Sequence, residues 1–231
     1  DVKSTEVSEA FITSMSETDI LTEDGKSILL STALNIDIPI VKTVIDKSDA
    51  IKSAWGEEDY MAFLSTVFET SLLKAIEDTN AVLKDRIINE FLPVYFAVEP
   101  ESLPYGAFVT NKYYAMGLGD YEAYNKSLEA YFKQQGENGE NVLVQELSEV
   151  LQNNELPEEV LEYSVQWINW IPEGERGFEL LYLSAIANVF TARPSVALQM
   201  VESARKIAVG EQLDELEKLV QFIEENNIYE E

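Results

Sequence analysis

Cysteine and histidine are both missing from this sequence of 231 residues. Without cysteine there is no disulfide, no thiol nucleophile and no zinc–thiolate site. Without histidine the chain lacks the commonest general base and the commonest metal ligand. No Gly-x-Ser-x-Gly segment occurs that would carry a serine nucleophile. We therefore expect no catalytic residue, no metal site and no cofactor.

Positive charge is also scarce, with 16 Lys and Arg residues against 43 Asp and Glu residues and a net charge of −27. A field of this sign repels phosphate backbones and anionic lipids, so we expect no nucleic-acid partner. The acidity is explained either by solubility or by attraction to a cationic ligand or a basic protein surface. No apolar run approaches the roughly 20 residues of a membrane span. The chain opens at Asp1 with no visible signal peptide, and we expect that a preceding segment has been removed.

Proline and glycine are few, with 7 and 10 residues, which favours long elements. Nearly every segment repeats apolar residues at 3-4 spacing, so the sequence predicts an all-α fold. A short helix is predicted at 7–14, and Ser16 followed by Asp19 is typical of an N-cap with an acidic residue three positions later. The segment 36–44 is rich in β-branched residues and compatible with a short strand, but Pro39 and the 3-4 spacing favour a helix.

The longer helices are predicted at residues 57–76, 79–96, 105–116, 121–134, 142–151, 158–170, 178–190, 195–209 and 212–225. Pro93 lies inside the second of these and would kink or end it. The segment 99–104 places two prolines among acidic residues and is the best candidate boundary. We therefore expect an N-terminal helical region, 1–98, followed by three helix pairs and a capping helix in 103–227, all within one continuous structural unit.

The spacing of two turns indicates a helical repeat. The turns at Gly119 and Arg193 are 74 residues apart, or two periods of 37, which is close to the 34-residue helix-turn-helix repeat. The segment GDYEA at 119–123 resembles the inter-helix turn of a tetratricopeptide repeat (TPR). Three alanines match the small positions at which TPR helices touch, and they are Ala185, Ala197 and Ala204.

These repeats are degenerate. Tyr124 and Tyr131 stand where the first repeat should carry alanine, and Arg193-Pro194 replaces the usual glycine-containing turn. The middle repeat, roughly 140–172, keeps only the spacing and a proline at its end. We therefore expect a degenerate TPR-like stack of antiparallel helix pairs, an α-α superhelix without regular geometry.

The resemblance extends upstream, through MSETDILT at 15–22 and AWGEE at 54–58. These segments are followed by a long helix pair and then by three degenerate helix pairs. This order is similar to that in the helical region that follows the thioredoxin-like domain in a group of secreted bacterial proteins. The similarity covers most of 14–227, and none of its motifs is highly specific. It implies a periplasmic or other extracytoplasmic location, beside a thioredoxin-like domain outside this chain. No Cys-x-x-Cys is present, so redox activity carries over to no residue.

Aromatic side chains crowd the first two helix pairs, and they are explained either by core packing or by a binding groove. In a TPR stack the first helix of each pair lines the concave groove. By this register, five residues would line it, and they are Tyr113, Met116, Tyr182, Val189 and Phe190. Because the sequence is acidic, we predict that these residues bind a protein or peptide that carries Lys or Arg.

Paired carboxylates such as Glu57-Glu58 and Glu158-Glu159 are better explained by helix starts and the helix dipole than by catalysis. We therefore predict a non-enzymatic protein-interaction or scaffold module. Two alternatives stay open. One is an envelope accessory protein that binds glycans through Trp167 or Trp170, and the other is a purely structural module.

Overall fold

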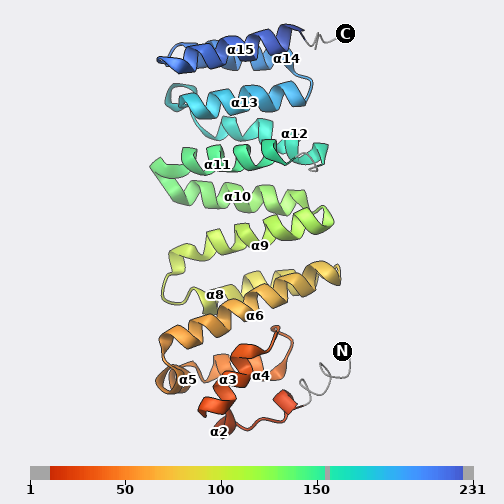
Figure 1. Ribbon diagram of the computed structural model, residues 1–231, viewed down its shortest axis with the longest axis vertical. Coiled ribbons are helices and arrows are strands. Elements are labelled where there is room, and N and C mark those ends of the chain that lie inside the picture. Colours follow the sequence, from red (N-terminus) through yellow and green to blue (C-terminus); the bar gives the residue numbers. More distant parts are fainter. Residues whose placement is uncertain (1–10, 154–156, 226–231) are drawn as a thin grey trace. The chain divides into compact units, whose positions relative to one another are not determined.

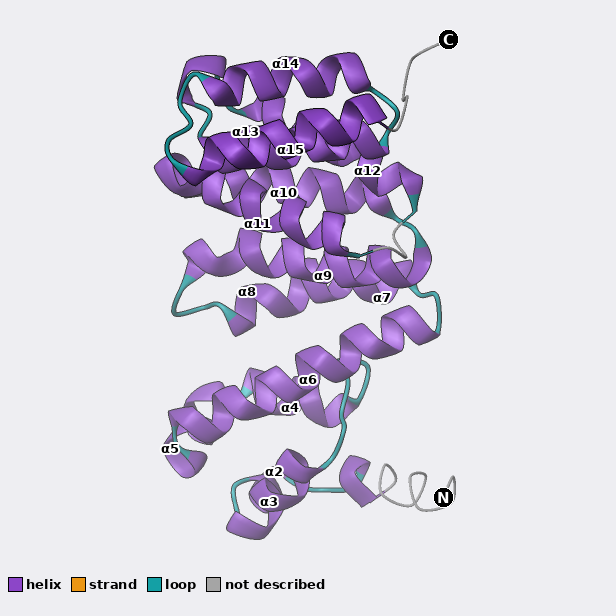
Figure 2. Cartoon of the chain, turned by 45° about the horizontal axis from the view of Figure 1, so that its top comes forward, coloured by secondary structure: helices purple, strands orange, loops and turns teal. Residues whose placement is uncertain are grey.

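The computed structural model describes residues 11–153 and 157–225, and the regular structure of these residues is helical, without a strand (Figure 2). The predicted all-α class is confirmed. Within these residues, no helix combines the length and the apolar character that crossing a membrane requires. The chain divides into two compact units, residues 1–124 and 125–231. This division falls later in the chain than the predicted boundary at 99–104.

Unit 1 begins with four short helices, α2 (Glu17–Ile20), α3 (Glu23–Ser31), α4 (Pro39–Asp46) and α5 (Ser48–Trp55) (Figure 1). The N-cap at Ser16 is confirmed. Its hydroxyl accepts the Asp19 N–H, and the Asp19 carboxylate accepts the Ser16 N–H at 2.8 Å, which forms a capping box. The choice of helix over strand for the segment beginning at Ile36 is also confirmed, because α4 starts at Pro39. Of the predicted helix 7–14, residues 11–13 are helical and residues 7–10 lie outside the described residues.

The core of unit 1 forms where these short helices meet α6 (Glu57–Glu77). The buried Trp55 indole N–H donates to the Ile20 carbonyl at 2.9 Å, and its ring meets Phe63 edge-on with centroids 5.8 Å apart. The buried Ser71 hydroxyl accepts the Ile36 N–H at 3.0 Å and donates to a carbonyl of its own helix. Because buried polar groups are costly when unpaired, these bonds favour one arrangement of α2, α5 and α6.

Residues 79–96, predicted as one helix, form α7 (Ala81–Arg86), a π-helical turn at Ile87–Phe91 and α8 (Leu92–Tyr95). Pro93 disturbs this segment, as predicted, but the irregularity lies before it. Pro93 has no N–H and its ring crowds the carbonyl one turn earlier. The helix widens there, and the Leu92 N–H bonds to the carbonyl of Ile87, five residues back.

Helix α9 (Leu103–Leu118) begins inside the segment predicted as a boundary and packs against α6, α7 and α8. Two glycines permit a close approach. A Cβ atom at Gly106 would lie 2.5 Å from a ring carbon of Phe96, and one at Gly117 would lie 2.6 Å from Cγ2 of Ile76. The proline-rich boundary segment is therefore the start of a packed helix. This is the physical reason that the two compact units do not divide there.

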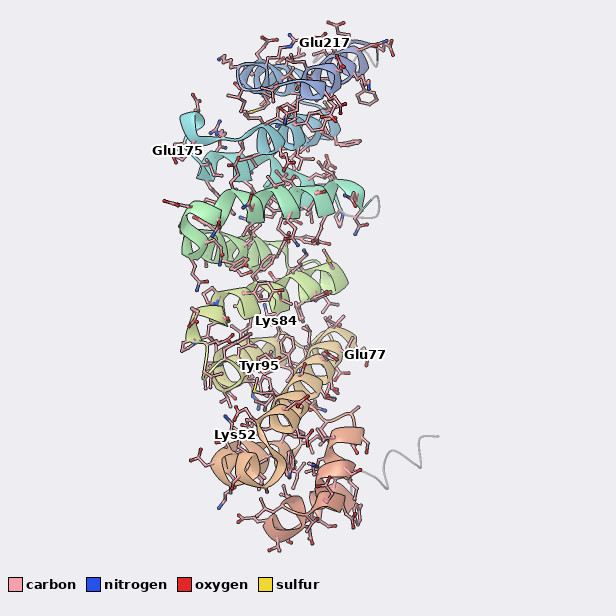
Figure 3. The ribbon with its side chains drawn as sticks, turned by 60° about the vertical axis from the view of Figure 1, so that its left-hand side comes forward. Lys52, Glu77, Lys84, Tyr95, Glu175 and Glu217 are labelled. Atoms are coloured by element: carbon pink, nitrogen blue, oxygen red, sulfur yellow. The ribbon has the colours of Figure 1, made fainter. Side chains whose placement is uncertain are left out.

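Helix α9 ends at Gly119, next to a buried lysine that pairs with the following residue. Gly119 terminates the helix with φ +85°, a left-handed conformation that favours glycine. The Lys84 ammonium of α7 donates to the Asp120 carboxylate at 3.0 Å and lies 5.0 Å from the ring centre of Tyr114 (Figure 3). The ion pair and the cation–π contact compensate the burial of this charge.

Helix α10 (Tyr121–Gln135) spans the division between the units. Unit 2 continues with α11 (Gly139–Gln152), α12 (Glu158–Trp167), α13 (Phe178–Phe190), α14 (Pro194–Arg205) and α15 (Glu211–Glu225). Helix α13 is its central element, because it packs against α11, α12, α14 and α15 (Figure 1). The three alanines that were matched to small TPR positions, Ala185, Ala197 and Ala204, are completely buried on α13 and α14.

Helix α14 is shorter than the predicted helix 195–209. The next apolar residues, Ile207 and Val209, are 47% and 71% exposed, so they bury too little surface to support further helix. Between α13 and α14, Ala192 has φ +54°, the left-handed conformation for which a TPR turn would use glycine. The predicted polar tail, residues 226–231, lies outside the described residues.

Side-chain bonds tie the helices of unit 2 together. The Glu140 carboxylate of α11 accepts the Gly177 N–H at the start of α13. The buried Trp167 indole donates to Asn125 Oδ1 of α10 at 2.7 Å. Arg193, before α14, pairs with Glu162 of α12. Each bond joins segments distant in sequence, so the register between helices is specified by polar contacts as well as by apolar packing.

We expect Trp55→Phe to lower the free energy of unfolding by about 1–3 kcal/mol, because the buried Ile20 carbonyl loses its hydrogen-bond donor. Urea unfolding followed by far-ultraviolet circular dichroism measures this change. Tyr113→Phe is the control, since it alters an exposed ring of the same unit and should leave the unfolding midpoint unchanged. Equal midpoints for Trp55→Phe and the parent protein would contradict the assigned role of the bond.

Candidate functional site

A cavity of about 590 Å³ opens in unit 1 between α6, the end of α8 and α9. We call it the apolar groove. Its volume lies within the range of about 300–1,000 Å³ that is usual for ligand sites. It is lined by Ser65, Phe68, Glu69, Leu72, Leu73 and Ile76 of α6, by Leu92, Tyr95 and Phe96, and by Tyr105, Gly106, Val109 and Tyr113 of α9.

Packed aromatic rings line one side of the apolar groove. Tyr95, labelled in Figure 3, stacks nearly parallel to Phe68 with centroids 6.1 Å apart and meets Phe96 edge-on at 4.8 Å. Phe91, at the end of the π-turn, stacks on the same tyrosine at 6.2 Å. Such offset and edge-to-face pairs are favourable, so this wall is held in place before any ligand arrives.

The rim of the apolar groove exposes large side chains to water. Leu73 of α6 is 60% exposed, and Tyr113 of α9 is 56% exposed. Tyr105, one of the first residues of α9, is also exposed. The one charged residue in the lining is Glu69. The groove therefore offers apolar contact and tyrosine hydroxyls, which suit apolar side chains of a ligand.

A second cavity, of about 500 Å³, lies in unit 2 between α11, α13 and α15, and we call it the acidic groove. Its walls are Val144 and Ser148 of α11, Phe178, Glu179, Tyr182 and Leu183 of α13, and Glu211, Gln212 and Glu215 of α15. The rings of Phe178 and Tyr182, one turn apart on α13, stack with centroids 5.8 Å apart and planes 14° apart. Burial, and secondly the charge of Glu215, raise the pKa of Tyr182.

The five residues predicted to bind a partner fall in both units. Tyr113 lines the apolar groove, and Tyr182 lines the acidic groove. Met116 and Phe190 are exposed on α9 and α13 but belong to neither lining. Val189 is only 6% exposed, so the expectation that it faces a groove is corrected. It follows Ala185 by one helical turn and therefore shares that residue's buried face.

The tryptophans proposed as a glycan platform are packed inward. Trp167 is completely buried, and its indole N–H is used by Asn125. Trp170 is half-buried against Phe132, with ring centroids 5.5 Å apart. A sugar platform needs an open aromatic face, and Trp167 does not present one. The core-packing explanation therefore holds for Trp167.

Several groove residues were not predicted from the sequence. Phe178 lies four residues before the predicted Tyr182 on the same predicted helix, and that spacing was a detectable signal of a shared face. Glu211 and Glu215 come from another helix, and no local pattern reveals that α15 packs beside α13. For the apolar groove, the missing information was that Gly106 marks a close helix contact, because glycine inside a helix pattern indicates only lower helix propensity.

We expect Gly106→Ala to destabilise the protein although alanine is the better helix former, because the new methyl group would overlap Phe96. In a Phe96→Ala background the contact at 2.5 Å is gone, and Leu92, whose Cδ1 would lie 3.0 Å from the new methyl group, can shift into the vacated space. The same Gly106→Ala change should then stabilise the protein by up to about 1 kcal/mol. A double-mutant cycle in urea measures both effects. The same sign of effect in both backgrounds would contradict the close approach at Gly106.

We expect Tyr182 to ionise above the ordinary tyrosine value of 10.0 in the folded protein, chiefly because of burial. Because its pKa is raised on folding, the neutral phenol of Tyr182 favours the folded state. This contribution to stability is fully present below pH 10.0, the ordinary tyrosine pKa, and is lost as pH rises through the higher pKa of the folded protein. Glu215→Gln should lower the pKa of Tyr182 in part, whereas Glu224→Gln on the same helix should not. Nuclear magnetic resonance of ring-labelled tyrosine, assigned with Tyr182→Phe, measures the titration. Equal titration curves for the two variants would refute the coupling to Glu215.

No protein-family model, curated protein or solved structure matches this chain. The resemblance to thioredoxin-associated helical regions therefore stays a prediction. The two grooves and their side chains are the basis on which a function is inferred.

Proposed function

We propose that this chain is a non-catalytic protein-interaction module that holds an apolar peptide segment of a partner, in helical form, in the apolar groove. The single observation that supports this proposal is the groove itself. It is an open cavity of about 590 Å³ whose walls are aromatic and aliphatic and whose rim leaves Leu73 and Tyr113 exposed. Exposed apolar surface rimmed by polar residues is typical of a protein interaction site.

The walls favour a helical ligand. Amphipathic helices insert apolar side chains spaced at i, i+3 or i+4, and i+7 into grooves between other helices. Leu73 and Tyr113 come from two different helices, α6 and α9, so the groove offers an apolar contact on each of two helices. Burying such an apolar side chain contributes roughly 1.5–3 kcal/mol. Tyrosine adds a hydroxyl for hydrogen bonding and orders at low entropic cost, which suits an interface.

The charge of the chain selects among partners. With a net charge of −27, the protein repels nucleic acids and anionic membranes and attracts basic protein surfaces. The groove lining itself carries only Glu69 as a charged group. We therefore propose a ligand whose apolar stripe enters the groove and whose flanking residues are Lys or Arg. The attraction between the flanking charges and the acidic chain accelerates association more than it strengthens the complex.

The finer architecture and setting are part of the same proposal. We infer that the helices from α9 to α14 are degenerate TPR-like pairs that α15 caps. The turn at Gly119 and the buried Ala185, Ala197 and Ala204 support this inference. By the resemblance, the module works outside the cytoplasm as an accessory to a thioredoxin-like domain. Its contribution there is to hold client segments, while the redox chemistry belongs to the other domain.

Display of random 16-residue peptides tests the proposal. Selection on the parent protein should enrich peptides with apolar residues at helical spacing and Lys or Arg between them. Leu73→Asp combined with Tyr113→Ser should weaken the selected peptides by at least about tenfold, because two contact walls are lost. Val82→Asp is the control, since it charges another exposed apolar residue of the same unit outside the groove. No enrichment, or equal loss in the two variants, would refute binding in this groove.

A further inference from the structure

The acidic groove of unit 2 gathers negative charge that the protein does not neutralise. The carboxylates of Glu179, Glu211 and Glu215 line it, and no ion pair or hydrogen bond to them is found among residues 11–153 and 157–225. Some acidic residues of this unit do have basic partners, as Glu162 has Arg193 and Glu217 has Arg205. These unpaired carboxylates therefore line a cavity and can attract a cation from outside the protein.

The same cavity has an aromatic wall. Phe178 and Tyr182 stack nearly parallel, and both rings are half-buried in the groove lining. The ring of Tyr182 also lies within the field of Glu215, as its raised pKa indicates. A cation over an aromatic face is attracted by the ring, and more strongly when it is partly desolvated. Carboxylates beside an aromatic pair therefore favour an organic cation, which uses both groups at once.

The arrangement selects the kind of cation. Within the described chain, no three acidic side chains are gathered closely enough to hold a metal ion, and the groove carboxylates are no exception. The cavity of about 500 Å³ has room for a side chain together with its neighbours in a peptide. A guanidinium group is planar, stacks on aromatic faces and donates to two carboxylates at fixed angles, whereas a lysine ammonium is a hydrated point charge. Arginine therefore fits these walls better than lysine.

We propose that the acidic groove binds an arginine side chain of a basic peptide segment, stacked on the Phe178–Tyr182 pair and paired with carboxylates of the set Glu179, Glu211 and Glu215. The site belongs to unit 2 and shares no residue with the apolar groove. It stands even if the apolar groove binds nothing.

If these carboxylates only stabilise the starts of their helices, the expected result is different. Glu179 lies in the first turn of α13 and Glu211 in the first turn of α15, where acidic residues stabilise the helix dipole. If this were their whole role, their removal would change stability and leave peptide binding unchanged. Stability and binding are therefore measured separately on each variant.

The probe is the acetylated tripeptide amide Arg-Arg-Arg, with Lys-Lys-Lys and citrulline tripeptides for comparison. Binding is followed by nuclear magnetic resonance of ring-labelled tyrosine. We expect the arginine peptide to shift the Tyr182 resonance saturably, and the lysine peptide to bind at least about fivefold more weakly because it does not stack. The citrulline peptide, which is uncharged, should not bind.

The decisive comparison uses two triple variants of equal charge. Glu179→Gln with Glu211→Gln and Glu215→Gln should weaken the arginine peptide by at least about tenfold, since the paired carboxylates are lost. Glu173→Gln with Glu175→Gln and Glu224→Gln changes three exposed acids of the same unit outside the groove and should leave affinity nearly unchanged. Thermal unfolding checks that both variants fold. Should the acidic-groove triple variant not fold, Phe178→Leu and Glu215→Gln, which both keep the Tyr182 resonance, are tested singly and must each weaken binding.

Equal weakening in both triple variants would overturn the proposal, because it would reveal general attraction to an acidic protein. Equal affinity for arginine and lysine peptides would overturn the assignment to arginine. Peptides selected for the apolar groove should bind the triple variant of the acidic groove as tightly as they bind the parent protein. This comparison separates a failure of the arginine site from a failure of the proposed function.

Discussion

The close approach of α9 to α6 and α8 is the constraint on which the apolar groove depends. At Gly106 and Gly117 a Cβ atom would collide with Phe96 and Ile76, so only glycine lets the helix lie at this distance. The π-turn before Pro93 contributes Phe91 to the same aromatic cluster as Tyr95. Between these contacts the helices leave the cavity of the apolar groove, and side chains such as Leu73 and Tyr113 line its edge without filling it. A groove between closely packed helices holds its shape without a ligand, and this limits the entropy lost on binding.

Most charged and polar side chains have partners within the protein when they are buried, whereas the exposed carboxylates of the acidic groove have none in the described part of the chain. The buried Lys84 is compensated by Asp120 and the ring of Tyr114. Buried polar side chains such as Thr110 and Asn188 donate to carbonyls one turn earlier in their own helices, at 2.8 Å in both cases. These buried groups are therefore satisfied within the protein, whereas the buried Ser184 hydroxyl has no hydrogen-bond partner among the described residues. The acidic groove is the contrasting case, since its carboxylates are exposed, close to aromatic rings and without a cation among the described residues. This difference connects the acidic composition with a particular place on the molecule.

The fold could be predicted from the sequence to the extent that it is local. The 3-4 periodicity identified α6 and α13 almost to the residue, and the capping residue Ser16 marked a true helix start. The register argument failed at Val189, because almost every face of α13 is covered by another helix and an apolar residue there need not face a groove. The grooves could not be predicted, since they depend on which helices pack together. Glu215 and Tyr182 lie on helices far apart in the sequence, and nothing local joins them.

A photo-crosslinking experiment tests the central claim, that the apolar groove holds a partner segment, most directly. A photoreactive phenylalanine analogue replaces Leu73, or Val82 as an exposed apolar site outside the groove, in the protein expressed in its native cells. The account predicts a discrete adduct at position 73, whose crosslinked peptide carries apolar residues at helical spacing flanked by Lys or Arg, and no such adduct at position 82. The absence of an adduct at position 73, or the same adducts at both positions, would contradict it.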